Sequence, residues 1–247
     1  MTVHQHDWTT AAELPLEEET VDLVISDPPY NIGVPYADDD TNDGLPLGEY
    51  FEWLIAPSMR ASLAMLRPGG IAAWICPAKH GGAIWTLIAQ GEFERRECLW
   101  GAPIVWRESF AQYQQRRMTE DYRFIFLIRK PGGELTFNPD DIRIQSKRQE
   151  MGDKRADPRG RVPGMVWEVR RLQGTSSDRV DWHPAQLAPE LIQRLVLGFS
   201  NPGELVVDPF AGSGNVGVCC KRTGRRFVGF DKSATYVEKA NDRIGGN

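Results

Sequence analysis

Short apolar runs alternate with longer helix-forming segments along most of this 247-residue chain. The short runs predict strands at about 21–26, 71–76, 95–106, 122–129, 204–207 and 226–230. The longer segments predict helices at about 48–66, 80–91, 187–200, 214–223 and 233–244. Arg67-Pro68-Gly69-Gly70 is a stop signal for the first helix. This alternation predicts an α/β domain whose mainly parallel sheet carries helices on both faces.

The alternation fades in one segment, 131–181, where proline, glycine and charged residues dominate. We interpret 131–181 as an insert that separates a first half, 1–130, from a second half, 182–247, of the same domain. The stretch from Arg143 to Arg179 contains ten Lys or Arg residues and only five Asp or Glu residues, although the whole chain carries a net charge of −5. A basic insert on an acidic body can bind phosphates locally without adhering to every polyanion.

Composition excludes several classes of protein. A hydrophobic content of 41% and an aromatic content of 10% are typical of a globular domain. No apolar run approaches the roughly 18–20 residues that span a bilayer, so no membrane partner is expected. The first residues lack a basic and then apolar leader, which predicts a cytoplasmic protein. The four cysteines fit neither a disulfide framework nor a metal-ligand spacing, and no metal is predicted, the residues being Cys76, Cys98, Cys219 and Cys220.

Two short motifs follow predicted strands and carry the chemistry. Asp27-Pro28-Pro29-Tyr30 follows the strand at 21–26, and Asp208-Pro209-Phe210-Ala211-Gly212-Ser213-Gly214 follows the strand at 204–207. In an open α/β sheet, ligands bind in the crevice outside the carboxyl ends of the strands. We therefore expect the two motifs to lie side by side although they are far apart in the sequence.

The second motif has the features of a cofactor loop. Gly212 and Gly214 allow a sharp turn and a close approach of the backbone to a ligand. The helix that follows would direct unpaired N–H groups at an anionic group. Asp231 ends the next strand, 17 residues after Gly214, where an acid can accept both hydroxyls of a ribose. A glycine loop alone is weak support, but this ordered series predicts a nucleoside-like cofactor.

The first motif is the more informative one. Its prolines fix φ and remove two backbone donors, so the turn is stiff and its carbonyls act only as acceptors. Asp27 adds a charged acceptor, and we expect Tyr30 to be an exposed aromatic face for stacking. An exocyclic amino group has two N–H donors, which would match Asp27 and the Pro28 carbonyl. Such a grip would turn the nitrogen lone pair away from the ring and toward an electrophile.

These motifs resemble those of the S-adenosylmethionine-dependent DNA amino-methyltransferases, which methylate adenine N6 or cytosine N4. The resemblance covers most of the chain and implies a Rossmann-like fold, S-adenosyl-L-methionine as cofactor and double-stranded DNA as partner. The catalytic motif before the cofactor motif is the order of the β subgroup. The implied catalytic residues are Asp27, Pro28, Pro29 and Tyr30. The implied cofactor contacts are Asp7, Asp27, His183, Gln186, Asp208, Phe210, Ala211, Gly212, Ser213, Gly214 and Asp231.

The resemblance also gives the insert a function, as the segment that recognises the DNA target. Its phosphate and base-edge contacts would come from Arg143, Lys147, Arg148, Lys154, Arg155, Arg159, Arg161, Arg170 and Arg171. The segment 106–119 could equally be a lid over a flipped-out base or a plain loop. One departure from the family pattern is Leu187-Ala188-Pro189, where Lys-Pro usually follows His-Pro-x-Gln, so no lysine contact to the cofactor is expected there.

Adenine N6 is the favoured target, because within the family Asp at position 27 is more usual for adenine and Ser for cytosine. Cytosine N4 stays open as the alternative. A protein glutamine amide also has two N–H donors, but enzymes that methylate it tend to carry Asn at this position and need no basic insert. A catalytically inactive DNA-binding protein would not need both motifs intact. A homodimer and a cognate restriction endonuclease both stay open.

Overall fold

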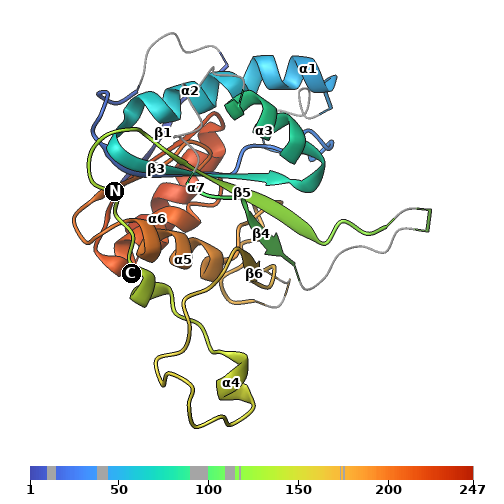
Figure 1. Ribbon diagram of the computed structural model, residues 1–247. Coiled ribbons are helices and arrows are strands. Elements are labelled where there is room, and N and C mark those ends of the chain that lie inside the picture. Colours follow the sequence, from blue (N-terminus) through green and yellow to red (C-terminus); the bar gives the residue numbers. More distant parts are fainter. Residues whose placement is uncertain are drawn as a thin grey trace.

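An eight-stranded sheet forms the centre of the computed structural model (Figure 1), which describes residues 1–9, 15–37, 44–89, 100–108, 115–116, 118–172, 174 and 176–246. The strands are ordered β1-β8-β7-β2-β3-β5-β4-β6. Neighbouring strands are parallel except that β5 runs antiparallel to both β3 and β4. Their bounds are Thr2–Gln5 (β1), Val21–Ser26 (β2), Leu66–Pro77 (β3), Ile104–Arg107 (β4), Tyr122–Arg129 (β5), Val166–Glu168 (β6), Leu205–Asp208 (β7) and Arg226–Asp231 (β8).

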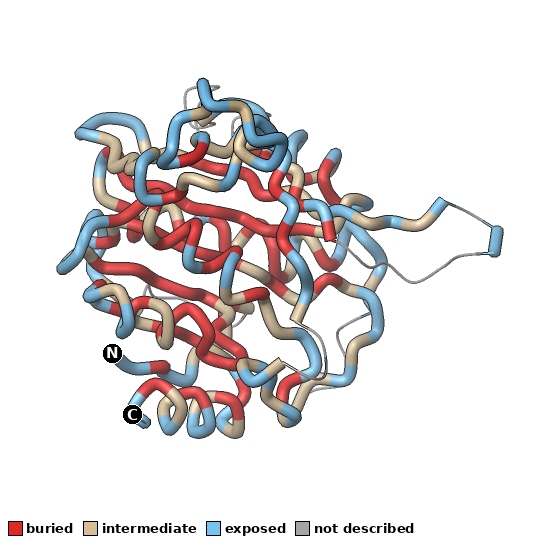
Figure 2. The backbone as a smooth tube through the Cα atoms, turned by 90° about the horizontal axis from the view of Figure 1, so that it is seen from below, coloured by how far each residue is buried: buried red, intermediate tan, exposed pale blue. Residues whose placement is uncertain are grey.

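Helices cover both faces of the sheet, as predicted. One face carries α1 (Leu47–Tyr50), a π-helical segment (Phe51–Ile55), α2 (Ala56–Met65) and α3 (Gly81–Ala89), and the other carries α5 (Pro189–Phe199), α6 (Asn215–Thr223) and α7 (Ala234–Gly245). Short helical turns lie at Ala78–His80, Pro139–Ile142 and Lys147–Glu150 (α4). Figure 2 shows that buried residues follow the central segments of the chain, while exposed residues lie around the periphery.

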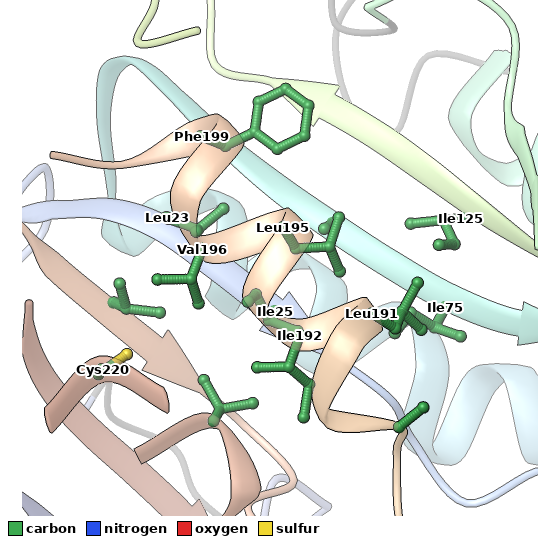
Figure 3. Packing of buried hydrophobic residues seen from close by; sticks show 14 of the residues in the cluster. Leu23, Ile25, Ile75, Ile125, Leu191, Ile192, Leu195, Val196, Phe199 and Cys220 are labelled. Carbon is green, nitrogen blue, oxygen red and sulfur yellow. The ribbon is translucent and has the colours of Figure 1, made fainter. Parts of the chain in front are cut away.

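The alternation of side chains along the strands builds a core on each face. Leu23 and Ile25 of β2 belong to the cluster under α5, whereas Val24 between them belongs to the cluster under α2. Figure 3 shows how α5 lays one apolar side on Leu23 and Ile25, through Leu191, Ile192, Leu195, Val196 and Phe199. Burial on both faces explains why these strands have continuous apolar sequences.

Most predicted elements are confirmed, and two strands were missed. β1 has only one buried residue, Val3, and β6 is a three-residue edge strand, so neither has a usable apolar pattern. β3 also begins at Leu66, earlier than predicted, because Arg67 to Gly70 continue the strand after the helix has ended. The predictions for 95–99 and 90–91 lie outside the described residues.

Proline shapes the first long helix. Pro57 has no N–H to donate to the carbonyl of Trp53, one turn earlier. The chain widens to a π-helical turn over Phe51–Ile55 and returns to α geometry at Ala56. The helix therefore stays continuous and still buries Leu54, Ile55 and Met59 against the sheet.

The insert is anchored at both ends and projects in the middle. Asn138 donates hydrogen bonds to the carbonyls of Leu197 and Ser200 at the end of α5, and β6 pairs with β4 at the sheet edge. Between these anchors, residues 144–161 form an arm that stands away from the domain and carries α4 (Figure 1). An antiparallel bridge between Ile144 and Arg161 closes the base of this arm.

Asp22 joins three strands at the end of the sheet opposite the two motifs. One carboxylate oxygen accepts a hydrogen bond from Arg67 Nε on β3 at 2.5 Å, and the other accepts one from the Leu205 backbone N–H on β7 at 2.8 Å. Because the pair is mostly shielded from water, we expect Asp22→Ala to lower the free energy of unfolding by about 2 kcal/mol. Urea denaturation of the purified protein measures this change.

The control is Asp121→Ala, which removes a half-exposed ion pair with Arg107 whose closest N–O distance is 3.5 Å. We expect that control to change the free energy of unfolding by less than about 1 kcal/mol. Equal losses in the two variants would contradict the special position of Asp22.

Candidate functional site

A cavity of about 310 Å³ lies at the carboxyl ends of the central strands. β2 and β7 are direct neighbours, with Leu23 opposite Val206 and Val24 opposite Val207. The chain continues from β2 to β3 on one side, while β7 lies on the other, so a crevice opens between the loops that follow β2 and β7. Among the sequence-predicted residues, the cavity is lined by Asp7, Asp27, Pro28, Pro29, Tyr30, Arg171, His183, Gln186, Asp208, Phe210, Ala211, Gly212, Ser213 and Asp231.

The glycine loop takes its shape from two left-handed residues. Gly212 has a φ of +45°, and a Cβ at this position would lie 2.6 Å from His183 Nε2. Gly214, with a φ of +74°, precedes the first residue of α6. The Gly212 N–H donates to Asp231 Oδ2 at 2.9 Å, and the Ser233 N–H donates to Asp231 Oδ1 at the same distance. Asp231 therefore holds the glycine loop against the end of β8 in addition to lining the cavity.

Asp208 supports the start of the same loop. Its carboxylate is buried and accepts a hydrogen bond from the Phe210 N–H at 3.0 Å. Burial raises the pKa of Asp208 well above its usual range, and the nearby charges of Asp27 and Asp231 add to this effect. Three acidic side chains thus interact electrostatically at one end of the cavity.

His183 and Gln186 line the cavity from the segment that precedes α5. Burial lowers the pKa of His183 to about 4, so its imidazole is neutral at physiological pH. The Gln186 amide is engaged by the protein itself: its oxygen accepts from the Val180 N–H, and its nitrogen donates to the Asp178 carbonyl and to Asn215 Oδ1. Gln186 thereby fastens this segment to the start of α6.

Asp7 lies beside an aromatic wall that the sequence did not predict. Asp7 Oδ1 accepts hydrogen bonds from the N–H and the hydroxyl of Thr9. Trp8 Nε1 donates to the Pro209 carbonyl at 2.7 Å, and the Trp8 ring contacts His6 and Phe230 edge-on. Within the described residues, His6 Nε2 is buried and has no hydrogen-bond partner. The sequence signal for this aromatic wall was Trp8, which directly follows the expected acid Asp7.

The expectation that Tyr30 is exposed is wrong. Its side chain is only 9% exposed, and its hydroxyl donates to Asp27 Oδ1 at 2.5 Å. The cause is Arg123, whose guanidinium carbon lies 4.6 Å from the centre of the Tyr30 ring and covers that face. The Pro29 carbonyl is also occupied, because it accepts the Tyr50 hydroxyl from α1. The Asp27–Tyr30 motif is therefore held in place by contacts on several sides.

Asp27 is a buried carboxyl at the centre of this arrangement. Burial raises its pKa to about 6, while Arg123 and the hydrogen bond from Tyr30 act in the opposite direction. Above that pH the side chain is a carboxylate that can accept hydrogen bonds from a ligand. Arg123 and its partner Glu108 line the same cavity and were missed by sequence reasoning. The signal was a charged residue within the apolar strand that begins at Tyr122.

Apart from Arg171, which lines the cavity and has its Nε 3.7 Å from Glu108 Oε2, the predicted basic residues of the insert divide into two groups. Arg143 is largely covered and bonds to Asp140 and to the Gly160 carbonyl, and Arg155 and Arg159 pair with Asp153 and Asp157. Other cations are exposed on or beside the arm, namely Lys147, Arg148, Lys154, Arg161 and Arg170. In the part of the insert that the structure describes, Lys147, Arg148 and Lys154 form no ion pair.

Neither a metal-binding group nor a membrane-spanning helix is found among the described residues. No group of three or more His, Cys, Asp or Glu side chains there could hold a metal ion. No described helix is both long enough and apolar enough to cross a bilayer. The lid or loop expected at 106–119 includes residues 109–114 and 117, which lie outside the described residues.

Comparison with known proteins gives consistent matches over almost the whole chain. The family model for N6/N4 DNA methylases matches residues 21–242. The type II methyltransferase M.HpaI of Haemophilus parainfluenzae is 30% identical over 233 residues, which are 93% of this chain and 69% of that protein. The DNA adenine methyltransferase YhdJ of Escherichia coli K12 is 28% identical over 235 residues, which are 92% of this chain and 76% of that protein.

Solved structures have the same fold. TTHA0409 of Thermus thermophilus, a putative DNA modification methylase complexed with S-adenosyl-L-methionine, matches with a TM-score of 0.62 and 21% identity over 99% of this chain and 93% of its own. The cytosine-N4-specific PvuII DNA methyltransferase matches with a TM-score of 0.64 and 14% identity over 94% of this chain and 85% of its own. At these identities the likeness concerns the fold.

The match of the family model agrees with the order of the motifs along the chain and with their meeting in one cavity. The chain belongs to the DNA methylase family, whose members are the S-adenosylmethionine-dependent amino-methyltransferases that act on adenine N6 or cytosine N4 of DNA.

Proposed function

We propose that this DNA methyltransferase transfers the methyl group of S-adenosylmethionine to N6 of an adenine flipped out of double-stranded DNA. The observation that carries the proposal is the position of the Asp27 carboxylate in the same cavity as the Gly212 loop. Asp rather than Ser at position 27 favours adenine, and so does the similarity to a relative named as a DNA adenine methyltransferase.

The residues of the cavity fit a sulfonium cofactor with a nucleoside. The loop at 210–214 would hold it, since Gly212 allows the left-handed turn of this loop and the close packing of His183 against its backbone, and Asp231 and Asp7 would accept hydrogen bonds from its polar groups. The unpartnered His6 Nε2 offers a further polar contact. The Asp27 carboxyl, whose pKa is about 6, carries a negative charge at neutral pH and suits a positively charged ligand. When bound, S-adenosylmethionine supplies an electrophilic methyl group.

The catalytic motif would prepare the amino group for attack. One amine N–H would donate to Asp27 and the other to the Pro28 carbonyl, since the Pro29 carbonyl already accepts the Tyr50 hydroxyl. Held this way, the nitrogen lone pair leaves conjugation with the ring and points at the electrophile. As the nitrogen gains positive charge it becomes acidic, and Asp27 is placed to take the proton that is lost when the new C–N bond has formed.

Access to the base requires that it leave the duplex, at a cost of a few kcal/mol. Because the Tyr30 ring is covered by Arg123 on one side, it can offer the base only its remaining surface. The arm at 144–161 projects from the domain and carries exposed cations, which suits contacts to DNA phosphates while the base occupies the cavity (Figure 1).

The product identifies the base. We expect DNA treated with the protein and S-adenosylmethionine to contain N6-methyladenine when it is digested to nucleosides and analysed by mass spectrometry. The same two acceptors could hold the amino group of cytosine, so N4-methylcytosine in place of N6-methyladenine would support the alternative target. If an intact and folded protein formed neither N6-methyladenine nor N4-methylcytosine, this absence of both products would contradict methyl transfer to DNA.

Asp27→Ala tests the catalytic motif. It removes an acceptor that acts on the reacting nitrogen, so we expect the rate of methyl transfer to fall by at least about 100-fold. The affinity for S-adenosylmethionine, measured by calorimetry, should change little because the glycine loop and Asp231 are intact. In the unaltered protein, the rate should fall as the pH drops through about 6, where Asp27 becomes protonated. The matched control is Glu238→Ala, an exposed carboxylate on α7, and turnover by Asp27→Ala equal to this control would refute the assignment.

The arm is tested by the salt dependence of DNA binding. Arg148→Ala combined with Lys154→Ala removes two exposed cations, so the slope of log affinity against log salt concentration should become about 2 units shallower. The control combines Arg222→Ala with Arg226→Ala, at the end of α6 and the start of β8. These residues lie at the end of the strands opposite the cavity. Their removal should leave the slope of log affinity against log salt concentration unchanged. Equal slopes in both double variants would place the DNA contact elsewhere.

A further inference from the structure

We propose that Arg123 is a positioning residue for methyl transfer, which fixes Tyr30 and sets the charge of Asp27, and that Glu108 tunes its effect. This inference rests on the proposed role of Asp27 as the acceptor for the target amine. Neither Arg123 nor Glu108 belongs to the two motifs, and they come from a different part of the sheet.

The direction of β5 explains how Arg123 reaches the site. Most strands present their carboxyl ends at the cavity, but β5 runs antiparallel to its neighbours, so its first residues lie at that edge. Arg123 is paired with Pro77 at the end of β3 and with Trp106 near the end of β4. Because β5 is reversed, Arg123 near its start lies beside the cavity, where the other strands contribute the loops that follow their carboxyl ends.

Four side chains form a continuous chain of contacts at this edge. Glu108 Oε1 accepts a hydrogen bond from Arg123 Nε at 2.7 Å. The Arg123 guanidinium packs on the Tyr30 ring, and the Tyr30 hydroxyl donates to Asp27 Oδ1. A cation on an aromatic face stabilises the orientation of the ring, and this orientation directs the hydroxyl to the carboxylate. A change at Arg123 is therefore transmitted to Asp27 both through Tyr30 and through the electric field.

Burial strengthens the electrostatic effect of Arg123 and Glu108 on the neighbouring side chains. Glu108 is 6% exposed and the Arg123 side chain 22% exposed, so water screens them poorly. Burial alone lowers the pKa of Arg123, but Tyr30, Glu108 and Asp27 together raise it above its usual value, and the guanidinium stays charged. Removing Arg123 would leave Glu108 with the half-exposed Arg171, whose Nε lies 3.7 Å from Glu108 Oε2, so a poorly compensated buried charge would remain.

Arg123 and Glu108 act on Asp27 with opposite signs. Arg123 lowers the pKa of Asp27 and Glu108 raises it, against the larger effect of burial. The other titratable groups that interact with Asp27 are Tyr30 on its own loop, Cys76 at the end of β3 and Asp208 at the end of β7. Burial raises the pKa of the Cys76 thiol to about 12, so that group stays neutral. Asp208 is common to all variants below and does not alter the differences between them.

The experiment compares pH profiles of single-turnover methyl transfer for Arg123→Met, Arg123→Lys and Glu108→Gln. We expect Arg123→Met to move the acidic limb of the profile to higher pH by about one unit, because the opposing cation is lost. Glu108→Gln keeps an acceptor for Arg123 but loses the negative charge, so its limb should move to lower pH. Arg123→Lys should keep the limb near its original position. The affinity for S-adenosylmethionine should be similar in all of them.

Opposite shifts in the two charge variants would support the proposal, because a role in packing alone does not move the limb. Limbs that stay in place, or that move in the same direction, would overturn it. If Arg123→Met does not fold, as judged by circular dichroism, the shift of Glu108→Gln decides. If Asp27→Ala keeps full activity, the proposed function fails instead, since the acidic limb then belongs to another group.

Discussion

The parallel pairing of β2 with β7 is the constraint on which the site depends. Only Leu23–Val206 and Val24–Val207 are in register, yet this short ladder places two loops from distant parts of the chain at one edge of the sheet. Asp22 reinforces the same junction from the other end, where it joins β2 to β3 and β7. A residue at the opposite end of the strands thereby contributes to the relative position of the two loops that carry Asp27–Tyr30 and Asp208–Gly214.

Burial of charge is the second physical theme of the site. Asp27 and Asp208 are buried carboxyl groups whose pKa values are raised mainly by loss of water. Such groups are costly to keep ionised unless a cation or a hydrogen bond offsets the cost. Arg123 and the Tyr30 hydroxyl provide that offset for Asp27 in the folded protein. Asp27 thus stays a carboxylate at neutral pH, which would suit a ligand that carries positive charge.

The sequence predicted the local elements and loops better than the contacts between them. The motifs Asp27–Tyr30 and Asp208–Gly214 were found because each follows an apolar strand and has an unusual composition. β1 and β6 escaped prediction because short strands at or near a sheet edge need no apolar pattern. The burial of Tyr30 depends on Arg123, on a distant strand, and the engagement of Gln186 depends on Asn215, 29 residues further along the chain. Such contacts have no trace in local periodicity.

The charge composition of the insert likewise does not predict which contacts its charged residues make. Counting residues predicts a basic segment, but it cannot separate arginines that brace the chain from cations that face solvent. Arg143 is 19% exposed and bonds to Asp140 and to the Gly160 carbonyl, so it stabilises the base of the arm. Arg155 and Arg159 each pair with the acid two residues earlier in the chain. The exposed arm cations outside these ion pairs are therefore fewer than the count suggests, namely Lys147, Arg148, Lys154 and Arg161. The proposed contact with DNA phosphates therefore depends on a few cations of a projecting arm and not on the insert as a whole, because an acidic body attached to them would repel a duplex.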